Sequence, residues 1–111
     1  MPIRNKWLPF TKPVIQDLPM HFSGVYEVGK ARGNKVLYIG QSGSSIRARL
    51  LTHKGKIDFM ECTHFRKQKT EPEYASKTEK QLLTQYIRRY SEKPPINKIM
   101  SPGDPWEGIL Y

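Results

Sequence analysis

Residues 24–40 constrain the fold of this chain most, because they form two short strand-like segments joined by a tight turn. Residues 25–28 and 36–39 are rich in β-branched and aromatic side chains, and glycine and asparagine cluster between them. This pattern is typical of a β-hairpin. We therefore predict antiparallel strands over residues 22–29 and 34–40.

The register of this hairpin decides what its two tyrosines do. A three-residue loop over residues 31–33, with Gly33 in the left-handed conformation, would place Tyr26 directly opposite Tyr38. Side chains opposite each other share one face of the sheet, with Cβ atoms ~5 Å apart. Two interpretations stay open from this stretch alone. The phenols either form a packing pair or belong to a reactive site.

The net charge points to a polyanionic partner. The chain has 111 residues, enough for one small domain, and its 19 Lys and Arg against 10 Asp and Glu give a formal charge of +9. Nucleic acid is the commonest partner of so basic a domain, and an anionic membrane surface is the alternative. The sequence lacks an amphipathic basic helix with bulky apolar residues, which a membrane-surface protein would use. We therefore expect a nucleic-acid partner and no membrane binding.

The sequence also argues against some locations and some kinds of site. It contains no apolar run of about 18 residues and no apolar core of a secretory signal near its start. Cys62 is the only cysteine, which excludes an internal disulfide and a cysteine-cluster metal site. We expect a reducing, cytoplasmic setting.

The remaining elements follow from caps, prolines and periodicity. Four prolines predict an irregular arm over residues 1–20, which either packs on the domain or lies on nucleic acid. Ser44 or Ser45 begins a helix over about 45–55, and alternation predicts a strand over about 58–66. A capping-box pattern at residues 70–73 begins a helix over about 72–90.

A proline-rich tail over residues 94–111 follows, whose Trp106, Ile109, Leu110 and Tyr111 we expect to pack on the domain. The expected fold is a single α/β domain of the α+β kind over residues 1–111. It has a three-stranded antiparallel sheet flanked by two helices, and a motif core over residues 22–98.

One region carries positive charge without any negative charge. No acid occurs between Glu27 and Asp58, whereas a solvated charge run normally mixes signs. A surface of one sign beside the hairpin suits a phosphate backbone. The residues that we expect to bind nucleic acid there are Lys30, Arg32, Lys35, Arg47, Lys54 and Lys56.

Two helices carry side chains suited to phosphate chemistry. Arg49 and His53 are four residues apart, so they project from one side of the first helix. Glu79 falls within the apolar stripe of the second helix. A carboxylate there is costly unless it is paired or binds a cation, and the alternative is that it lies at the stripe's edge and reaches water.

Together these motifs resemble the GIY-YIG nuclease superfamily of small α/β endonuclease domains. Gly24-Val25-Tyr26 is similar to the first triplet, with valine in place of isoleucine, and Tyr38-Ile39-Gly40 matches the second. The resemblance extends over most of the chain. The further matching residues are Arg49, His53, Glu79 and the asparagine of Pro95-Ile96-Asn97.

The resemblance implies a divalent-metal-dependent endonuclease that hydrolyses phosphodiester bonds in DNA, double-stranded or branched. It implies Tyr26 as general base, with Tyr38 orienting the water or the phosphate. Because a free phenol is a poor base at neutral pH, we expect help either from nearby cations (Arg49, the metal) or from a neutral His53 that accepts the proton. Arg49 would clamp the phosphate, and Glu79 would bind Mg²⁺ (or Mn²⁺). Asn97 would hold the site in place. A homodimer or a larger nuclease complex is compatible with so short a chain. The alternative is a non-catalytic nucleic-acid-binding module with the same fold.

Overall fold

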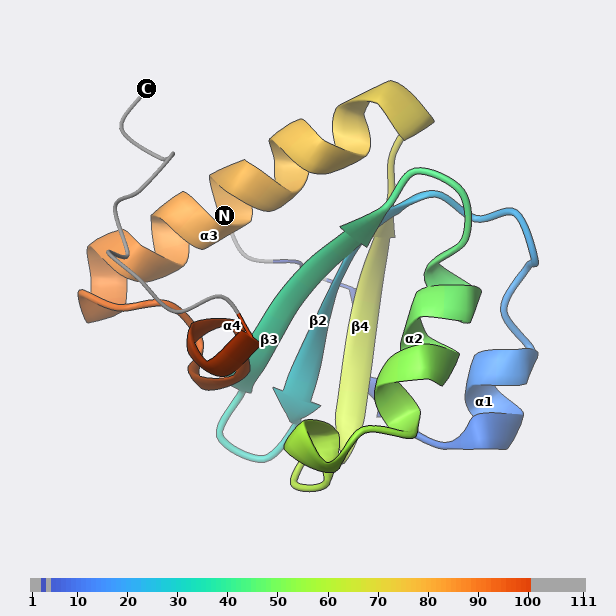
Figure 1. Ribbon diagram of the computed structural model, residues 1–111, viewed down its shortest axis with the longest axis horizontal. Helices are drawn as coiled ribbons and strands as arrows, with labels where there is room; N and C mark the ends of the chain where they lie inside the picture. The colour runs from blue at the N-terminus through green and yellow to red at the C-terminus, as the bar shows by residue number, and fades with distance from the viewer. Residues whose placement is uncertain (1–2, 4, 101–111) are drawn as a thin grey trace.

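The chain folds as an α+β domain around a four-stranded antiparallel sheet (Figure 1). The computed structural model describes residue 3 and residues 5–100, so the expected packing of Trp106 and its neighbours lies outside the described residues. The strand order is β1-β4-β2-β3. The strands are β1 (Leu8–Pro9), β2 (Gly24–Lys30), β3 (Lys35–Ser42) and β4 (His64–Lys69). The predicted class is confirmed, and the expected three strands are corrected to four.

The arm before the hairpin is more regular than its prolines indicated. Its β1 pairs with β4, and α1 (Lys12–Gln16) follows directly. Pro13 lies in the first turn of α1, where its missing N–H costs no helical hydrogen bond. Phe10, between the two elements, is buried in the core. The prolines therefore shorten these elements without abolishing them.

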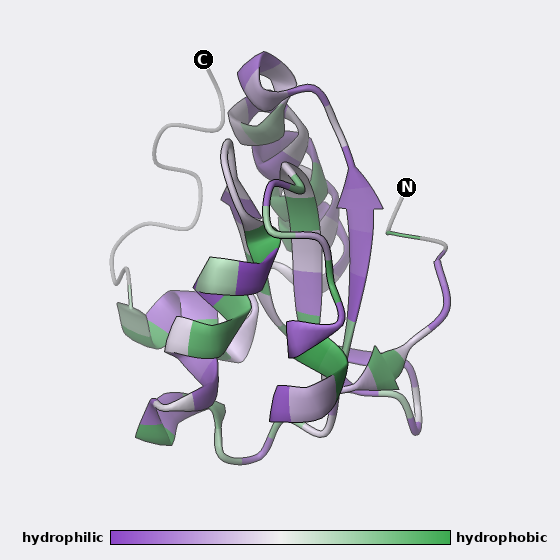
Figure 2. Cartoon of the chain, turned by 90° about the vertical axis from the view of Figure 1, so that its right-hand side faces the viewer, coloured by the Kyte–Doolittle hydropathy of each residue, from purple (hydrophilic) through white to green (hydrophobic). Residues whose placement is uncertain are grey.

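The strand predicted over 58–66 begins later than the alternation indicated. Residues 57–59 form a short 3₁₀ turn, η1 (Ile57–Phe59), in which Phe59 is buried and Ile57 is exposed. The single buried residue of this turn, Phe59, produces the same alternation of apolar and polar residues in the sequence as the start of a strand. β1 pairs only with His64 and Phe65, so the C-terminal half of β4 has a neighbouring strand, β2, on one side only, and it is correspondingly hydrophilic (Figure 2).

The predicted register of the hairpin is wrong by two residues. The loop has four residues, 31–34, and a bulge follows between Val28 and Gly29. Gly33 has the expected positive φ of 78°, and Asn34 also adopts one, 51°. Tyr26 therefore lies opposite Gly40, and Tyr38 lies opposite Val28. An even shift keeps both tyrosines on one face, and their ring centroids are 6.2 Å apart.

The helix α2 (Ile46–Lys54) matches its prediction. Ser45 accepts a hydrogen bond from the backbone N–H of Ala48 at 3.1 Å, as an N-cap does. Gly55 ends the helix.

The last two helices differ from the prediction. A 3₁₀ turn, η2 (Pro72–Tyr74), precedes α3 (Ala75–Tyr90), so the helix proper starts three residues late. The expected capping box does not form: the N-cap of η2 is Glu71, which makes no side-chain capping bond, and the Thr70 hydroxyl donates to the carbonyl of Glu71. The region described from the sequence as a proline-rich tail contains a helix, α4 (Pro95–Met100), whose first residue is a proline.

The helices cover the two faces of the sheet separately (Figure 1). Ile46 and Leu50 of α2 pack on one face with Tyr26 and Val28. Leu82 of α3 packs on the other face with Val25 and Ile39. Among the described residues, no helix is both long enough and apolar enough to cross a membrane.

The outer edge of β3 is held by one side chain of α4. The Asn97 amide nitrogen donates to the carbonyl of Ile39 at 2.9 Å, and its oxygen accepts from the Ile39 N–H at 2.8 Å. Asn97 thus supplies the two hydrogen bonds that another strand would make at this point. This contact anchors α4 beside the Tyr38-Ile39-Gly40 triplet.

We expect the substitution Asn97→Ala to lower the free energy of unfolding by about 2 kcal/mol, because it leaves two backbone groups of Ile39 without protein partners. Urea denaturation measures this change. Lys98→Ala is the matched control on the same helix. It breaks an exposed ion pair with Glu92 and should cost about 0.5 kcal/mol or less. Equal losses in the two variants would contradict the anchoring role of Asn97.

Candidate active site

The site begins with a tyrosine that lies across a glycine. Tyr26 is fully buried, and its ring covers the backbone of Gly40 on the edge strand β3. A Cβ atom at Gly40 would lie 2.6 Å from both Cζ and Oη of Tyr26 and 2.7 Å from Cε2 of Tyr38. Such distances are far inside van der Waals contact, so only glycine allows this close approach. The close approach of the Tyr26 ring thus explains on steric grounds why the second triplet, Tyr38-Ile39-Gly40, ends in glycine.

The glycine of the first triplet is also required by geometry. Gly24 has a φ of 152°, and a Cβ atom there would lie 2.1 Å from the carbonyl oxygen of Gln68 on β4. Any side chain would push β2 and β4 apart at this point. Gly24 therefore fixes the start of β2, two residues before Tyr26.

The hydroxyl of Tyr26 is hydrogen-bonded to a histidine. Its oxygen lies 2.7 Å from Nε2 of His53, which α2 presents to the same face of the sheet. The imidazole stacks on Phe59, with ring centroids 4.4 Å apart and an interplanar angle of 16°. Nδ1 of His53 is buried and has no hydrogen-bond partner in the part of the chain that the structure describes.

Burial sets the protonation of this pair at neutral pH. It raises the pKa of Tyr26, and the neighbouring Tyr38 raises it further, which outweighs the opposing effect of Arg49. Burial lowers the pKa of His53 to about 4, helped by the positive charges of Arg49 and Lys56. At pH 7 the pair is therefore a neutral phenol beside a neutral imidazole. A neutral imidazole keeps one nitrogen able to accept a proton.

Arg49 lies one helical turn before His53 and is more exposed to solvent. Its interaction with the Tyr26 hydroxyl, followed by that with Tyr38, raises the pKa of its guanidinium. The side chain is thus a permanent cation held next to both phenols. A guanidinium in this position can donate two parallel hydrogen bonds to a phosphate.

Glu79 comes from α3, the helix on the other face of the sheet, and is half-buried. Burial raises the pKa of its carboxyl group, and Arg49 partly offsets this effect. The same carboxylate contributes to the raised pKa values of Tyr26 and Tyr38. Two helices on opposite faces therefore supply charges to one site, where the ring of Tyr26 lies across Gly40.

The loop before α2 is organised by one serine. Ser42, at the end of β3, accepts hydrogen bonds from the backbone N–H groups of Ser44 and Ser45 at 3.2 and 2.9 Å. Ser45 then caps α2. These bonds fix where α2 begins, and with it the positions of Arg49 and His53.

The residues present fit a divalent metal only through a single carboxylate. Within residue 3 and residues 5–100, no group of three or more His, Cys, Asp or Glu side chains could hold a metal ion. Glu79 offers one hard oxygen ligand beside the tyrosines. Mg²⁺ accepts such a site, because it keeps several waters and takes phosphate oxygens of a substrate as ligands.

The structure divides the basic residues expected to bind nucleic acid. Lys30 and Lys54 both lie near the thiol of Cys62, and Lys56 lies near His53, so these three gather on the α2 side. Arg47 is half-buried on α2. Arg32 and Lys35 instead line a pocket on the side of α3. The run of basic residues in the sequence thus falls into two groups on different sides of the molecule.

The sequence reasoning missed a buried ion pair. Nε of Arg66 donates to the Glu27 carboxylate at 2.6 Å, and both side chains are nearly fully buried. The available signal was Glu27 itself, an acid between two apolar residues in a strand. Its partner lies 39 residues away, which periodicity does not reveal.

No family model matches the chain, and no significant match was found among curated proteins or solved structures. The resemblance to GIY-YIG nucleases therefore stays a prediction from the motifs.

The burial of His53 predicts a pH-dependent stability. Its pKa falls from 6.5 in the unfolded chain to about 4 in the folded one, so the unfolded state binds more protons between these values. Stability from this group is complete above pH 6.5 and is lost as pH falls towards 4. Between pH 7.5 and 4.5 the loss should be roughly 2–3 kcal/mol.

Urea denaturation of the wild type and of His53→Gln at the two pH values isolates this effect. Between pH 7.5 and 4.5, the free energy of unfolding of His53→Gln should fall by roughly 2–3 kcal/mol less than that of the wild type. His21→Gln is the matched control, since His21 is exposed in a loop, and it should behave as the wild type. A His53→Gln variant with an unchanged pH dependence would contradict the neutral, buried imidazole.

Proposed function

We propose that this protein is a divalent-metal-dependent endonuclease that hydrolyses phosphodiester bonds in DNA. The observation that carries the proposal is the hydrogen bond from buried Tyr26 to neutral His53, with Arg49 and Glu79 acting on the same phenols. This set offers a proton acceptor, a phosphate clamp and a carboxylate, which phosphodiester hydrolysis needs. The motif resemblance to GIY-YIG nucleases supports the same assignment.

In this proposal Tyr26 works as a proton relay. Its raised pKa makes a standing phenolate unfavourable, so the hydroxyl takes a proton from the attacking water while giving its own to Nε2 of His53. His53 is a weak base in the free protein because Arg49 and Lys56 lower its pKa. A bound phosphate neutralises part of that positive charge and raises the proton affinity of the imidazole.

The other residues bind and orient the substrate. Arg49 donates two hydrogen bonds to phosphate oxygens, and Tyr38 orients the attacking water or the phosphate. Glu79 would hold Mg²⁺ or Mn²⁺, which when bound supplies positive charge to the phosphoryl oxygens and the leaving oxygen. Asn97 is a positioning residue, because it acts on Tyr38 and Gly40 through the backbone of Ile39.

Charge defines the proposed substrate. Lys30, Lys54 and Lys56 form a basic surface on the α2 side, which suits the phosphates of a double-stranded or branched DNA. The formal charge of +9 supports the same partner. A homodimer or a larger nuclease complex would extend this surface.

One observation favours a second candidate, a nucleic-acid-binding module without activity. Tyr26 is 0% exposed, so its hydroxyl reaches an attacking water only after local movement at the site. A module that only binds DNA would keep the basic surface and need no such movement. Cleavage assays separate the two functions.

We expect Tyr26→Phe to lower the cleavage rate by roughly 10²- to 10⁴-fold, because it removes the relay hydroxyl and little volume. Supercoiled plasmid and branched duplexes with Mg²⁺ are the substrates, and DNA binding should stay within twofold of the wild type. Tyr74→Phe, at an exposed tyrosine, is the control with wild-type activity. Wild-type cleavage by Tyr26→Phe would rule out the relay. A wild-type protein that binds but never cuts, with any divalent metal, would establish the binding module.

Glu79→Gln tests the metal. It removes one negative charge with little change in shape, so the concentration of Mg²⁺ that supports half-maximal cleavage should rise at least tenfold. Glu73→Gln, an exposed carboxylate in η2, is the matched control and should leave the Mg²⁺ dependence unchanged. Identical Mg²⁺ titrations of Glu79→Gln and the wild type would remove Glu79 from the metal site.

A further inference from the structure

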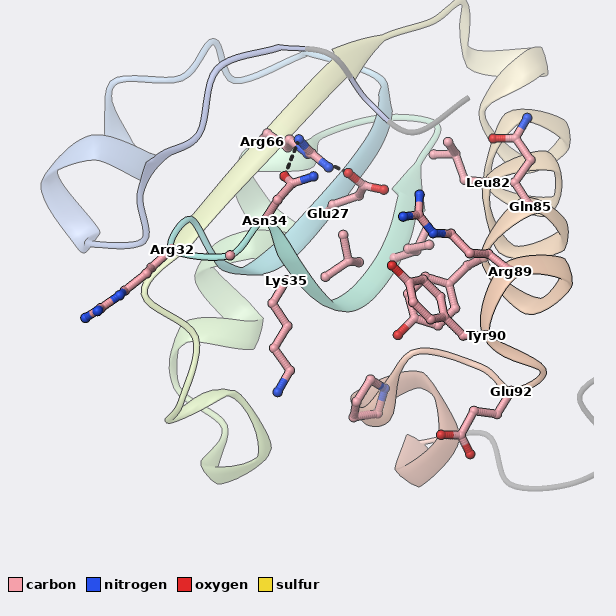
Figure 3. Close-up of a pocket in the computed structure, with 15 residues that line it drawn as sticks. Glu27, Arg32, Asn34, Lys35, Arg66, Leu82, Gln85, Arg89, Tyr90 and Glu92 are labelled. Atoms are coloured by element: carbon pink, nitrogen blue, oxygen red, sulfur yellow. Dashed lines mark hydrogen bonds and ion pairs between the residues drawn. The ribbon is translucent and has the colours of Figure 1, made fainter.

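A pocket of about 500 Å³ lies on the α3 side of the sheet (Figure 3), and Tyr26 is not among the residues that line it. Ile39 of β3 and Leu82 of α3 line its apolar part, and Tyr86 and Tyr90 add an aromatic wall, with ring centroids 4.5 Å apart. The volume is in the range of small-molecule sites. The pocket is therefore large enough for a ligand with a planar ring.

The buried ion pair between Glu27 and Arg66 is part of the pocket lining. The Arg66 guanidinium also donates through Nη1 to the Asn34 side chain at 3.1 Å. Its Nη2 is buried and has no hydrogen-bond partner among the residues that the structure describes. An unpaired buried donor is costly, and a ligand oxygen in the pocket would offset that cost.

The pocket also favours a negatively charged ligand. Arg89 extends from α3 across the pocket towards Glu27 and Arg66, and Arg32 is directed away from it (Figure 3). Lys35 adds a further positive charge to the lining. Of the two acids in the lining, Glu27 is paired with Arg66 and Glu92 with Lys98. Arg89 is thus the cation best placed to receive an anion.

We propose that this pocket binds a nucleotide. The base lies against Tyr86 and Tyr90, since aromatic side chains stack on the π-face of any base. The edge of the base meets Glu27 and Arg66, an acceptor and a donor side by side, and a base edge presents both kinds of group. The phosphate is held by Arg89.

This assignment does not rest on hydrolysis at Tyr26, because the two sites use different side chains. The nucleotide is either a free monophosphate or the terminal residue of a single strand. Both sources share the same chemistry, a planar base joined to a phosphate.

Tryptophan fluorescence provides a local readout. Trp7 donates through Nε1 to Asn34 at 2.9 Å, and the Arg66 guanidinium lies over its ring at 4.3 Å, so a ligand on Arg66 alters its surroundings. Trp106→Phe removes the second tryptophan and serves as the background. Titration with adenosine 5′-monophosphate should give a saturable change, whereas inorganic phosphate should bind at least tenfold more weakly.

Two charge reversals on neighbouring residues locate the ligand. Arg89→Glu should weaken adenosine monophosphate binding at least tenfold, while Arg88→Glu should stay within twofold of the parent. Arg88 carries the same charge on the same helix and does not line this pocket. Tyr90→Ala, at a half-exposed side chain whose loss the fold should tolerate, should also weaken binding.

A 5′-phosphorylated oligothymidine of five residues distinguishes the sources. Tighter Arg89-dependent binding of the oligonucleotide identifies a strand end as the ligand, and equal or weaker binding identifies a free nucleotide. Either result supports the pocket. The proposal is overturned by the absence of saturable binding for both ligands, by equal weakening in Arg88→Glu and Arg89→Glu, or by phosphate binding as tightly as the monophosphate.

Discussion

The close approach of the Tyr26 ring to the backbone of Gly40 is the contact on which the rest of the site depends. It directs a buried phenol towards the outer edge of the sheet, where His53 and Arg49 meet it from α2 and the charge of Glu79 acts on it from α3. A methyl group at Gly40 would occupy the space of the phenol. The arrangement therefore follows from the lack of a side chain at one position of an edge strand.

Edge strands need protection, and here the protection also serves the site. Asn97 satisfies the N–H and carbonyl of Ile39 in place of another strand, so α4 closes the edge beside the tyrosines. The asparagine was expected from the motif resemblance to hold the site in place. Its two hydrogen bonds to Ile39, the residue between Tyr38 and Gly40, are the contacts through which it would do so.

What the sequence could predict was governed by how local each signal is. α2 was predicted well because its cap, stripe and terminal glycine all lie within eleven residues. The hairpin was predicted, but its register was not. Asn34 is held in the left-handed loop by Trp7 and Arg66, which are distant in sequence. The ion pair of Glu27 with Arg66 was missed for the same reason. His53 was placed on the correct helix face, whereas the depth of its burial emerges only from packing against Phe59.

The alternation of β3 has a consequence for how experiments on this protein must be read. Tyr38 contributes to the site beside His53, and Ile39, the next residue, lines the pocket beneath α3. Two consecutive residues of one edge strand thus belong to the tyrosine site and to the pocket, and Asn97 binds the backbone N–H and carbonyl of the second of them. A substitution in β3 will therefore disturb the tyrosine site and the pocket together. No residue of α2 lines the pocket, so changes on α2 report on the tyrosine site. On α3, Glu79 acts on the tyrosines whereas Leu82 and Arg89 line the pocket, so a phenotype there must be assigned residue by residue.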